Sequence, residues 1–231
     1  MASRPLAVVL LSGGMDSCVC LALAARDYEA AVLHFDYGQR TEARERQAFT
    51  DMADHYGIER RLAVTTPFFG QIGGSALTDA TLAMPESGVD PSRIPITYVP
   101  FRNAHFLAAG VSWAEVLGAE VVMIGAVAPD SSGYPDCRPE FYDAFQKLVH
   151  VGARNSGVRI EAPLLLRNKS EIVRLGLELH APFPLSWSCY QNSGRACGRC
   201  DSCRLRRRAF CQAGASDPVQ YATACETMEE I

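Results

Sequence analysis

The alternation of apolar strands and amphipathic helices along the chain predicts an α/β fold with a doubly wound parallel sheet. Residues 6–11 form a continuous apolar run, which is typical of a strand that is buried on both faces. A turn with two glycines follows at residues 12–17 and leads into a segment with helical periodicity at 16–26. In such sheets, ligands bind beyond the carboxyl ends of the strands.

The rest of the chain continues the same pattern. Further strands are predicted at 30–35, 60–65, 120–125 and 158–162, and further helices at 41–56, 103–117, 139–154 and 169–179. Gly57 should end the second helix, and Asn168 with Glu171 forms a capping-box pattern at the start of the last one. Residues 66–100 are rich in Gly, Pro, Ser and Thr, and we expect this long excursion to line a site.

Composition narrows the classes of function. Lys and Arg total 22 against 26 Asp and Glu, so the basic excess of a nucleic-acid-binding protein is missing. The Arg-rich run at 204–208 is interpreted as a solvated helix face rather than as an RNA contact. The sequence contains no apolar stretch of membrane-spanning length and no pattern of a signal peptide, so we expect a cytoplasmic protein.

The glycine turn carries the first chemical signal. Two glycines allow the backbone to approach an anion, and the following helix offers its N–H groups to phosphate. Asp16 would repel phosphate unless a divalent cation lies between them, so its presence indicates Mg²⁺. No Lys follows the glycines, so this is not a Walker loop. The turn resembles the PP-loop of the ATP pyrophosphatases, and the residues expected to bind ATP are Leu11, Ser12, Gly13, Gly14, Met15, Asp16, Ser17 and Cys18.

Four of the nine cysteines are clustered near the end of the chain. In a reducing compartment such clustering indicates a metal rather than disulfides. Cys-x₂-Cys spacings let sulfurs converge on one ion, and four thiolates complete a closed tetrahedral zinc shell with a structural role. An iron–sulfur cluster is the alternative, because the same spacing occurs in ferredoxins. The predicted ligands are Cys189, Cys197, Cys200 and Cys203.

Further segments, in order along nearly the whole chain, resemble one family of PP-loop enzymes, the 7-cyano-7-deazaguanine synthases of queuosine biosynthesis. The matching segments are Phe35-Asp-Tyr-Gly-Gln-Arg40, Tyr98-Val-Pro-Phe-Arg-Asn103, residues 132–141, Pro163-Leu-Leu165 with Lys169 and Glu171-Ile172, Ser188-Cys-Tyr190 and the cysteine block.

The resemblance implies ATP-dependent conversion of a carboxy-deazaguanine and ammonia to a nitrile, one structural Zn²⁺ per chain, Mg²⁺ with ATP, and a homodimer. It implies no stable nucleic-acid partner and no membrane. Asp16, Ser17 and Lys169 would be catalytic, and the substrate contacts would be Arg102, Asn103, Tyr134, Asp136 and Arg138. Residues 1–180 would form the nucleotide-binding domain, and 181–231 a zinc-binding segment packed on it. Two alternatives stay open: a synthase-like paralogue that conjugates a deazaguanine to another acceptor, such as a protein in defence, and a PP-loop RNA-modifying enzyme.

Overall fold

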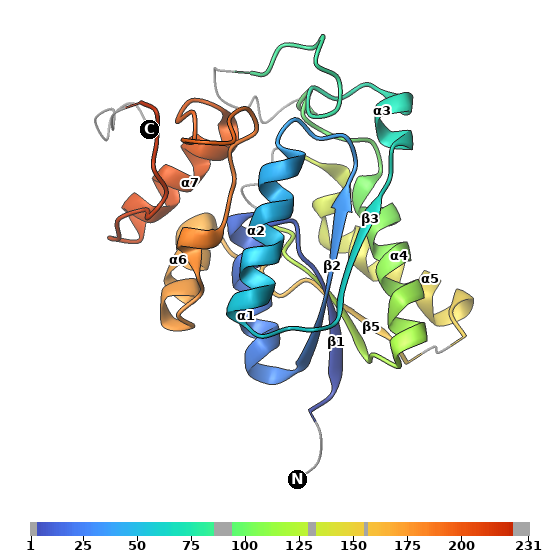
Figure 1. The fold of residues 1–231 in the computed structure, drawn as a ribbon. Helices are drawn as coiled ribbons and strands as arrows, with labels where there is room; N and C mark the ends of the chain where they lie inside the picture. Colours follow the sequence, from blue (N-terminus) through green and yellow to red (C-terminus); the bar gives the residue numbers. More distant parts are fainter. Residues whose placement is uncertain (1–3, 86–93, 129–132, 155–156, 224–231) are drawn as a thin grey trace.

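A five-stranded parallel sheet lies between two layers of helices (Figure 1). The structure is a computed structural model that describes residues 4–85, 94–128, 133–154 and 157–223. The strands are β1 (Leu6–Leu10), β2 (Glu29–Asp36), β3 (Arg61–Thr65), β4 (Val121–Ile124) and β5 (Arg159–Glu161). Their order is β3-β2-β1-β4-β5, and every neighbouring pair is parallel. The predicted α/β class with a doubly wound parallel sheet is confirmed.

The strand order places a switch point between β1 and β4. From β1 the chain winds outward through β2 to β3, and it then returns to β4 and β5 on the other side. The loops that leave β1 and β4 therefore diverge to opposite faces and open a crevice at the carboxyl ends. Figure 1 shows these ends at the top of the view, away from the N-terminus.

Both faces of the sheet are covered, which explains the unbroken apolar run of β1. Ala7 and Val9 pack into one core, and Val8 and Leu10 into the other. The first core is covered by α1 (Met15–Asp27), α2 (Glu42–His55), α6 (Lys169–Glu178) and α7 (Asp201–Gln212), and the second by α4 (Arg102–Leu117) and α5 (Pro139–Gly152). Helix α1, which follows β1, and helix α4, which precedes β4, lie on opposite faces of the sheet (Figure 1).

The predicted helix signals are present in the structure. Gly57 follows α2 in a left-handed conformation with φ 60°. At the start of α6 the Asn168 side chain accepts from the Glu171 N–H, and the Glu171 carboxylate accepts from the Asn168 N–H, both at 2.9 Å. The excursion at 66–100 contains the short helix α3 (Phe68–Ile72), which was not predicted. Residues 86–93 of the excursion lie outside the described part of the chain.

The last part of the chain packs on the phosphate-loop side of the sheet. It comprises the 3₁₀ turn Phe183–Leu185, the four cysteines and α7, which packs against α6. The Trp187 N–H donates to the Gly13 carbonyl at 2.8 Å, so this segment contacts the turn after β1 directly. Residues 224–231 of the predicted segment lie outside the described residues.

The prediction of a solvated face for the run 204–208 is wrong at Arg206. Its side chain is only 2% exposed and forms an ion pair with Asp217, at 2.9 Å from Nε. Its guanidinium also donates to the Ser186 hydroxyl at 2.7 Å. The helical period of α7 turns this one arginine inward, whereas Arg208 is exposed. No helix within the described ranges combines the length and the apolar character that a bilayer crossing requires.

Candidate active site and metal centre

The turn between β1 and α1 has the geometry of an anion-binding loop. Gly13 has φ 92°, and a Cβ on it would lie 2.7 Å from the Glu45 carbonyl oxygen, so a side chain is excluded there. Gly14 is the N-cap of α1 and makes no side-chain cap bond. The first N–H groups of a helix have no intrahelical acceptor, and the positive end of the helix dipole lies beside them. The loop therefore presents a backbone site for phosphate at the carboxyl end of β1.

Two hydroxyl groups complete the loop. Ser12 Oγ accepts from the Gly14 N–H at 3.2 Å and lies 3.1 Å from Ser17 Oγ. Ser17 Oγ donates to the Gly14 carbonyl at 3.0 Å. Leu11 and Met15 also line the adjoining cavity, whereas Cys18 is fully buried in the core and does not line it.

Asp16 and Lys169 meet across the crevice, although 153 positions separate them in the sequence. Lys169 Nζ lies 2.6 Å from Asp16 Oδ2, and both side chains are mostly buried. The second carboxylate oxygen, Asp16 Oδ1, is buried without a hydrogen-bond partner. A buried oxygen of this kind fits a hard cation such as Mg²⁺. Gly125 lies against this point, because a Cβ there would be 2.9 Å from the Asp16 backbone.

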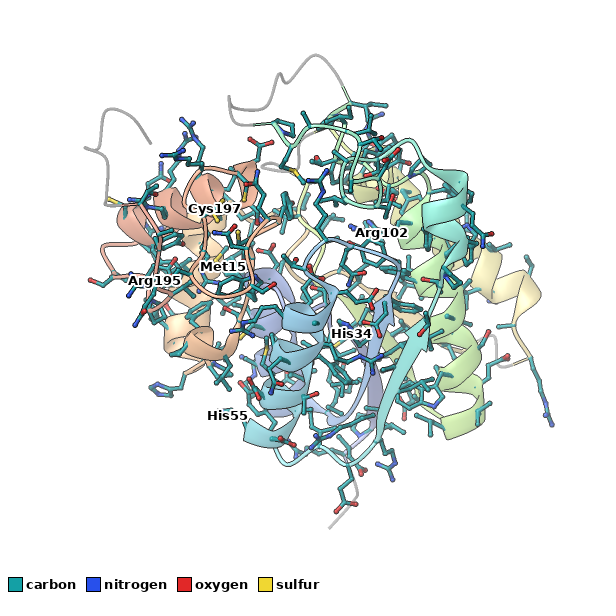
Figure 2. All side chains as sticks on the ribbon, turned by 45° about the horizontal axis from the view of Figure 1, so that its top comes forward. Met15, His34, His55, Arg102, Arg195 and Cys197 are labelled. Carbon is teal, nitrogen blue, oxygen red and sulfur yellow. The ribbon has the colours of Figure 1, made fainter. Side chains whose placement is uncertain are left out.

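A cavity of about 290 Å³ opens above the carboxyl ends of the strands. The phosphate loop and Lys169 form one wall, and Arg102 and Asn103 at the start of α4 form another. In Figure 2, Met15 and Cys197 lie to the left of the view and Arg102 lies to the right. The cavity thus joins the phosphate loop to the β4 side of the switch point.

The structure brings most of the predicted substrate residues together. Arg102 Nη1 donates to Tyr37 Oη at 3.0 Å, and the guanidinium stacks over the Tyr37 ring at 5.4 Å. Tyr134 lines the cavity, and its hydroxyl hydrogen-bonds with Thr97 Oγ1 at 2.9 Å. Arg138 is exposed at the N-terminus of α5 and does not line the cavity.

Asp136 and Asn103 form a buried pair behind the cavity wall. The Asn103 N–H donates to Asp136 Oδ2, and the Asn103 side-chain amide donates to the Asp136 carbonyl, both at 3.0 Å. Burial raises the pKa of Asp136, and Asp136 Oδ1 has no hydrogen-bond partner. Asn103 lines the cavity. Asp136 does not, and its hydrogen bonds fix the position of Asn103. Ser132, the first residue of the motif that carries Asp136, lies outside the described residues, as do residues 129–131 before it.

Several residues of the cavity wall were not predicted from the sequence. Glu45 enters from the first turn of α2, and Trp187 and Arg206 enter from the last part of the chain. The Arg44 guanidinium lies 4.6 Å from the centre of the Trp187 ring. The position of Glu45, one helical turn after Thr41 at a predicted helix start, was the available signal for it. Nothing in the sequence indicated that Arg206 turns inward.

The four predicted metal ligands converge. The sulfur atoms of Cys189, Cys197, Cys200 and Cys203 all lie within 4.8 Å of one another, and all four residues are buried. None of the described cysteines forms a disulfide.

Backbone N–H groups donate to the sulfur atoms of two of these cysteines. Cys189 Sγ accepts from the N–H groups of Asn192 and Cys197 at 3.3 Å, and Cys197 Sγ accepts from that of Cys200 at 3.3 Å. Hydrogen bonds from the neighbouring thiols of Cys200 and Cys203 hold the pKa of Cys189 well below its ordinary value. Four sulfur atoms at this separation fit the coordination shell of a metal ion, so the cluster can hold one.

Together, a phosphate loop at the switch point of a parallel sheet, an acid–lysine pair beside it and an adjoining cavity define an ATP-using enzyme of the PP-loop type. The family model described as "Queuosine biosynthesis protein QueC" matches residues 6–214. The chain belongs to this family of ATP-dependent, ligase-type enzymes.

Relatives agree with this assignment. The chain is 61% identical over 220 residues to the 7-cyano-7-deazaguanine synthase of Koribacter versatilis, covering 94% of this chain and 93% of that one. It is 57% identical over 223 residues to the synthase of the same name from Acidobacterium capsulatum, covering 95% and 97%. Among solved structures, the U34-tRNA thiolase NcsA from Methanococcus maripaludis with its [4Fe-4S] cluster matches at a TM-score of 0.48 and 16% identity, covering 90% and 65%. That likeness is too distant to bear on the metal.

Proposed function

We propose that this enzyme converts 7-carboxy-7-deazaguanine and ammonia to 7-cyano-7-deazaguanine, with ATP as the activating co-substrate. The observation that carries the proposal is the joined cavity, in which the phosphate loop and the Asp16–Lys169 pair face Arg102 and Asn103. One end suits a polyphosphate and the other a planar polar heterocycle with a carboxylate. The close relatives with the synthase name support this substrate.

The chain's own residues would act by binding and orienting the reactants. The loop from Ser12 to Ser17 would hold the pyrophosphate of ATP, and the Lys169 ammonium would stabilise negative charge on the α-phosphate as the bond to pyrophosphate breaks. Asp16 would hold Mg²⁺ through its unpartnered oxygen, and this ion would screen the phosphate charge. Arg102 and Asn103 would fix the deazaguanine, with Tyr134 beside them and Asp136 behind, whereas Arg138 does not line the cavity.

The reaction has two balanced halves. The substrate carboxylate attacks the α-phosphorus and releases pyrophosphate, and ammonia then displaces AMP from the acyl-adenylate to give the amide. The amide oxygen attacks a second ATP with loss of pyrophosphate, and departure of AMP with loss of the two N–H protons leaves the nitrile. Both activations would use the same phosphate loop.

For the cysteine cluster we propose one structural Zn²⁺ per chain. Four sulfurs leave no open coordination position, and this favours a closed site that stabilises residues 181–231 against a nucleotide-binding domain at 1–180. The alternative is an iron–sulfur cluster, which metal analysis and colour distinguish. We also propose a homodimer in the cytoplasm, where ATP is abundant and the cysteines stay reduced.

Product analysis tests the function. The purified enzyme with 7-carboxy-7-deazaguanine, ATP, Mg²⁺ and ammonium should form the nitrile, seen by mass spectrometry, and release AMP and pyrophosphate. Release should need the carboxylate or its amide. Equal release with RNA alone would replace the proposal by an RNA-modifying activity, and a deazaguanine adduct on a protein would replace it by conjugation.

A further inference from the structure

Glu45 is a carboxylate of the cavity that the steps above do not use. It lies in the first turn of α2, and its carbonyl oxygen packs against Gly13, where a Cβ would be 2.7 Å away. Its side chain lines the same cavity as the phosphate loop, Lys169 and Arg102. The backbone of Glu45 is therefore held at a constant position relative to the phosphate loop.

Two neutral groups hold the Glu45 carboxylate. Thr41 Oγ1 donates to Oε1 at 2.8 Å, and Gln39 Nε2 donates to Oε2 at 3.2 Å. The Gln39 amide has a defined orientation, because its oxygen accepts from the Tyr37 N–H at 2.8 Å and its nitrogen must then face Glu45. Within the described residues Glu45 forms no ion pair, unlike Asp16 with Lys169.

Thr41 can satisfy Glu45 in both of its protonation states. Its hydroxyl oxygen lies 2.8 Å from Glu45 Oε1 and 3.2 Å from the Cys189 carbonyl oxygen. A hydroxyl has one proton to donate, so it faces Glu45 when that carboxylate is charged. When Glu45 is protonated, its O–H can donate to Thr41, whose own proton turns to the Cys189 carbonyl. A proton can thus arrive and leave without an unsatisfied buried group.

The other ionisable groups around the cavity are poorly suited to accept a proton at neutral pH. Within the described part of the chain they are Asp16, Tyr37, Arg40, Arg102, Tyr134, Cys137, Lys169, Tyr190 and Arg206, with no histidine. Asp16 is paired with Lys169. Burial raises the pKa of Tyr37 to about 12 and that of Cys137 to about 11, so neither is ionised. Arginine and lysine are already protonated.

The reaction under Proposed function needs a proton acceptor, and this inference rests on that function. When the ammonia nitrogen bonds to the acyl-adenylate carbon, one N–H proton must leave as the C–O bond to AMP breaks. In the second half, both protons of the amide nitrogen must leave before the nitrile is complete. We propose that Glu45 is the general base that accepts these nitrogen protons and passes them to solvent.

The surroundings of Glu45 suit this role. Burial is the main cause that raises its pKa, to about 7, while the bonds from Thr41 and Gln39 lower it. Arg102 from α4 lowers the pKa further, and Asp36 at the end of β2, itself paired with Arg46, raises it. A base whose pKa lies near the working pH is both largely ionised and able to hold a proton in the transition state.

Glu45→Gln tests the role, because glutamine keeps the size and the hydrogen bonds but cannot take a proton. Adenylation of the carboxylate transfers no nitrogen proton. Substrate-dependent exchange of labelled pyrophosphate into ATP should therefore stay within about threefold of wild type, whereas formation of amide and nitrile should fall by about 10²–10⁴-fold, the usual contribution of a general base. Asp54→Asn, on the same helix but with a side chain 62% exposed, is the matched control.

The pH profile gives an independent readout. With saturating ammonium at each pH, kcat of the wild type should fall below about pH 7 as Glu45 becomes protonated, and this limb should be absent in Glu45→Gln. If the variant keeps full nitrile formation, the inference is wrong. If it instead raises KM for the deazaguanine, weakens exchange and keeps the pH limb, Glu45 binds substrate and is not the base. Absence of carboxylate-dependent exchange in the wild type would overturn the proposed function itself, so the two failures are distinct.

Discussion

The cysteine cluster and the cavity lie next to each other, but they differ in how far their polar groups are satisfied by protein partners. The four sulfurs are buried, lie close to one another and accept from backbone N–H groups around them. The cavity instead contains groups that lack a hydrogen-bond partner, such as Asp16 Oδ1, or that have only neutral donors, such as the Glu45 carboxylate. A closed polar site contributes to stability, whereas an open one keeps its groups available for ligands. Substitutions in the two regions should therefore differ in kind.

The largest effect is expected in the cluster. Cys200→Ser removes one of four ligands, so the free energy of unfolding should fall by about 3 kcal/mol or more, with loss of bound metal. The kcat of the molecules that remain folded should change little. Thermal melting with metal analysis measures this, and a colourless protein with one zinc and no stoichiometric iron or sulfide is expected for the wild type. A brown protein with near-equal iron and sulfide would overturn the zinc proposal.

Asp16→Asn should act in the opposite way. The variant loses the carboxylate that pairs with Lys169 and would hold Mg²⁺ beside the phosphates, so turnover should fall by at least about 10²–10³-fold. The melting temperature should change by only a few degrees, because asparagine keeps the size of the side chain and a polar oxygen that can still accept from Lys169. Steady-state release of AMP measures the loss of turnover, and differential scanning calorimetry measures the melting temperature. Wild-type turnover in this variant would remove Asp16 from the mechanism.

Substitution of Arg206 should affect both stability and turnover, because this residue lines the cavity and belongs to the segment that carries the four cysteines. Arg206→Met leaves the Asp217 carboxylate buried without its partner, which should cost about 3 kcal/mol of stability. Turnover should fall as well, since Arg206 also binds Ser186, next to the Trp187 N–H that holds Gly13. Urea unfolding and steady-state kinetics measure both. Arg208→Met, at an exposed position of the same helix, is the control, and equal effects of the two changes would contradict this role.

The smallest expected effect concerns how the free energy of unfolding depends on pH. The pKa of Glu45 is about 7 in the folded state and near 4.5 in the unfolded chain, so the folded state binds more protons between these values. The carboxylate therefore lowers stability as pH rises from about 4.5 to 7. Glu45→Gln lacks this loss and should be more stable than wild type by about 2 kcal/mol at pH 8, but not at pH 4. Urea unfolding at the two pH values measures the difference; an equal difference at both would show that Glu45 is not enclosed.

The fold and the local motifs could be predicted because each depends on neighbouring residues. The apolar run of β1, the two glycines after it and the Cys-x₂-Cys spacings all act over a few positions. The Asp16–Lys169 contact joins positions 153 apart, and only the winding of the sheet brings them together. Arg206 could not be distinguished from its neighbours, since an inward arginine needs the distant partner Asp217. Asp136 was expected at the substrate, and it lies behind Asn103, because buried polar groups need partners that a linear pattern does not reveal.

The hydrogen bond from the Trp187 N–H to the Gly13 carbonyl has a consequence for synthesis on the ribosome. The phosphate loop is made early in translation, and the wall that Trp187, Tyr190 and Arg206 add to its cavity is made late. A nascent chain therefore carries an exposed loop without the surface that completes the nucleotide site. ATP should be held tightly only after the last quarter of the protein has emerged and packed against the loop. This order of assembly would keep unfinished chains from activating substrates that they could not convert to product.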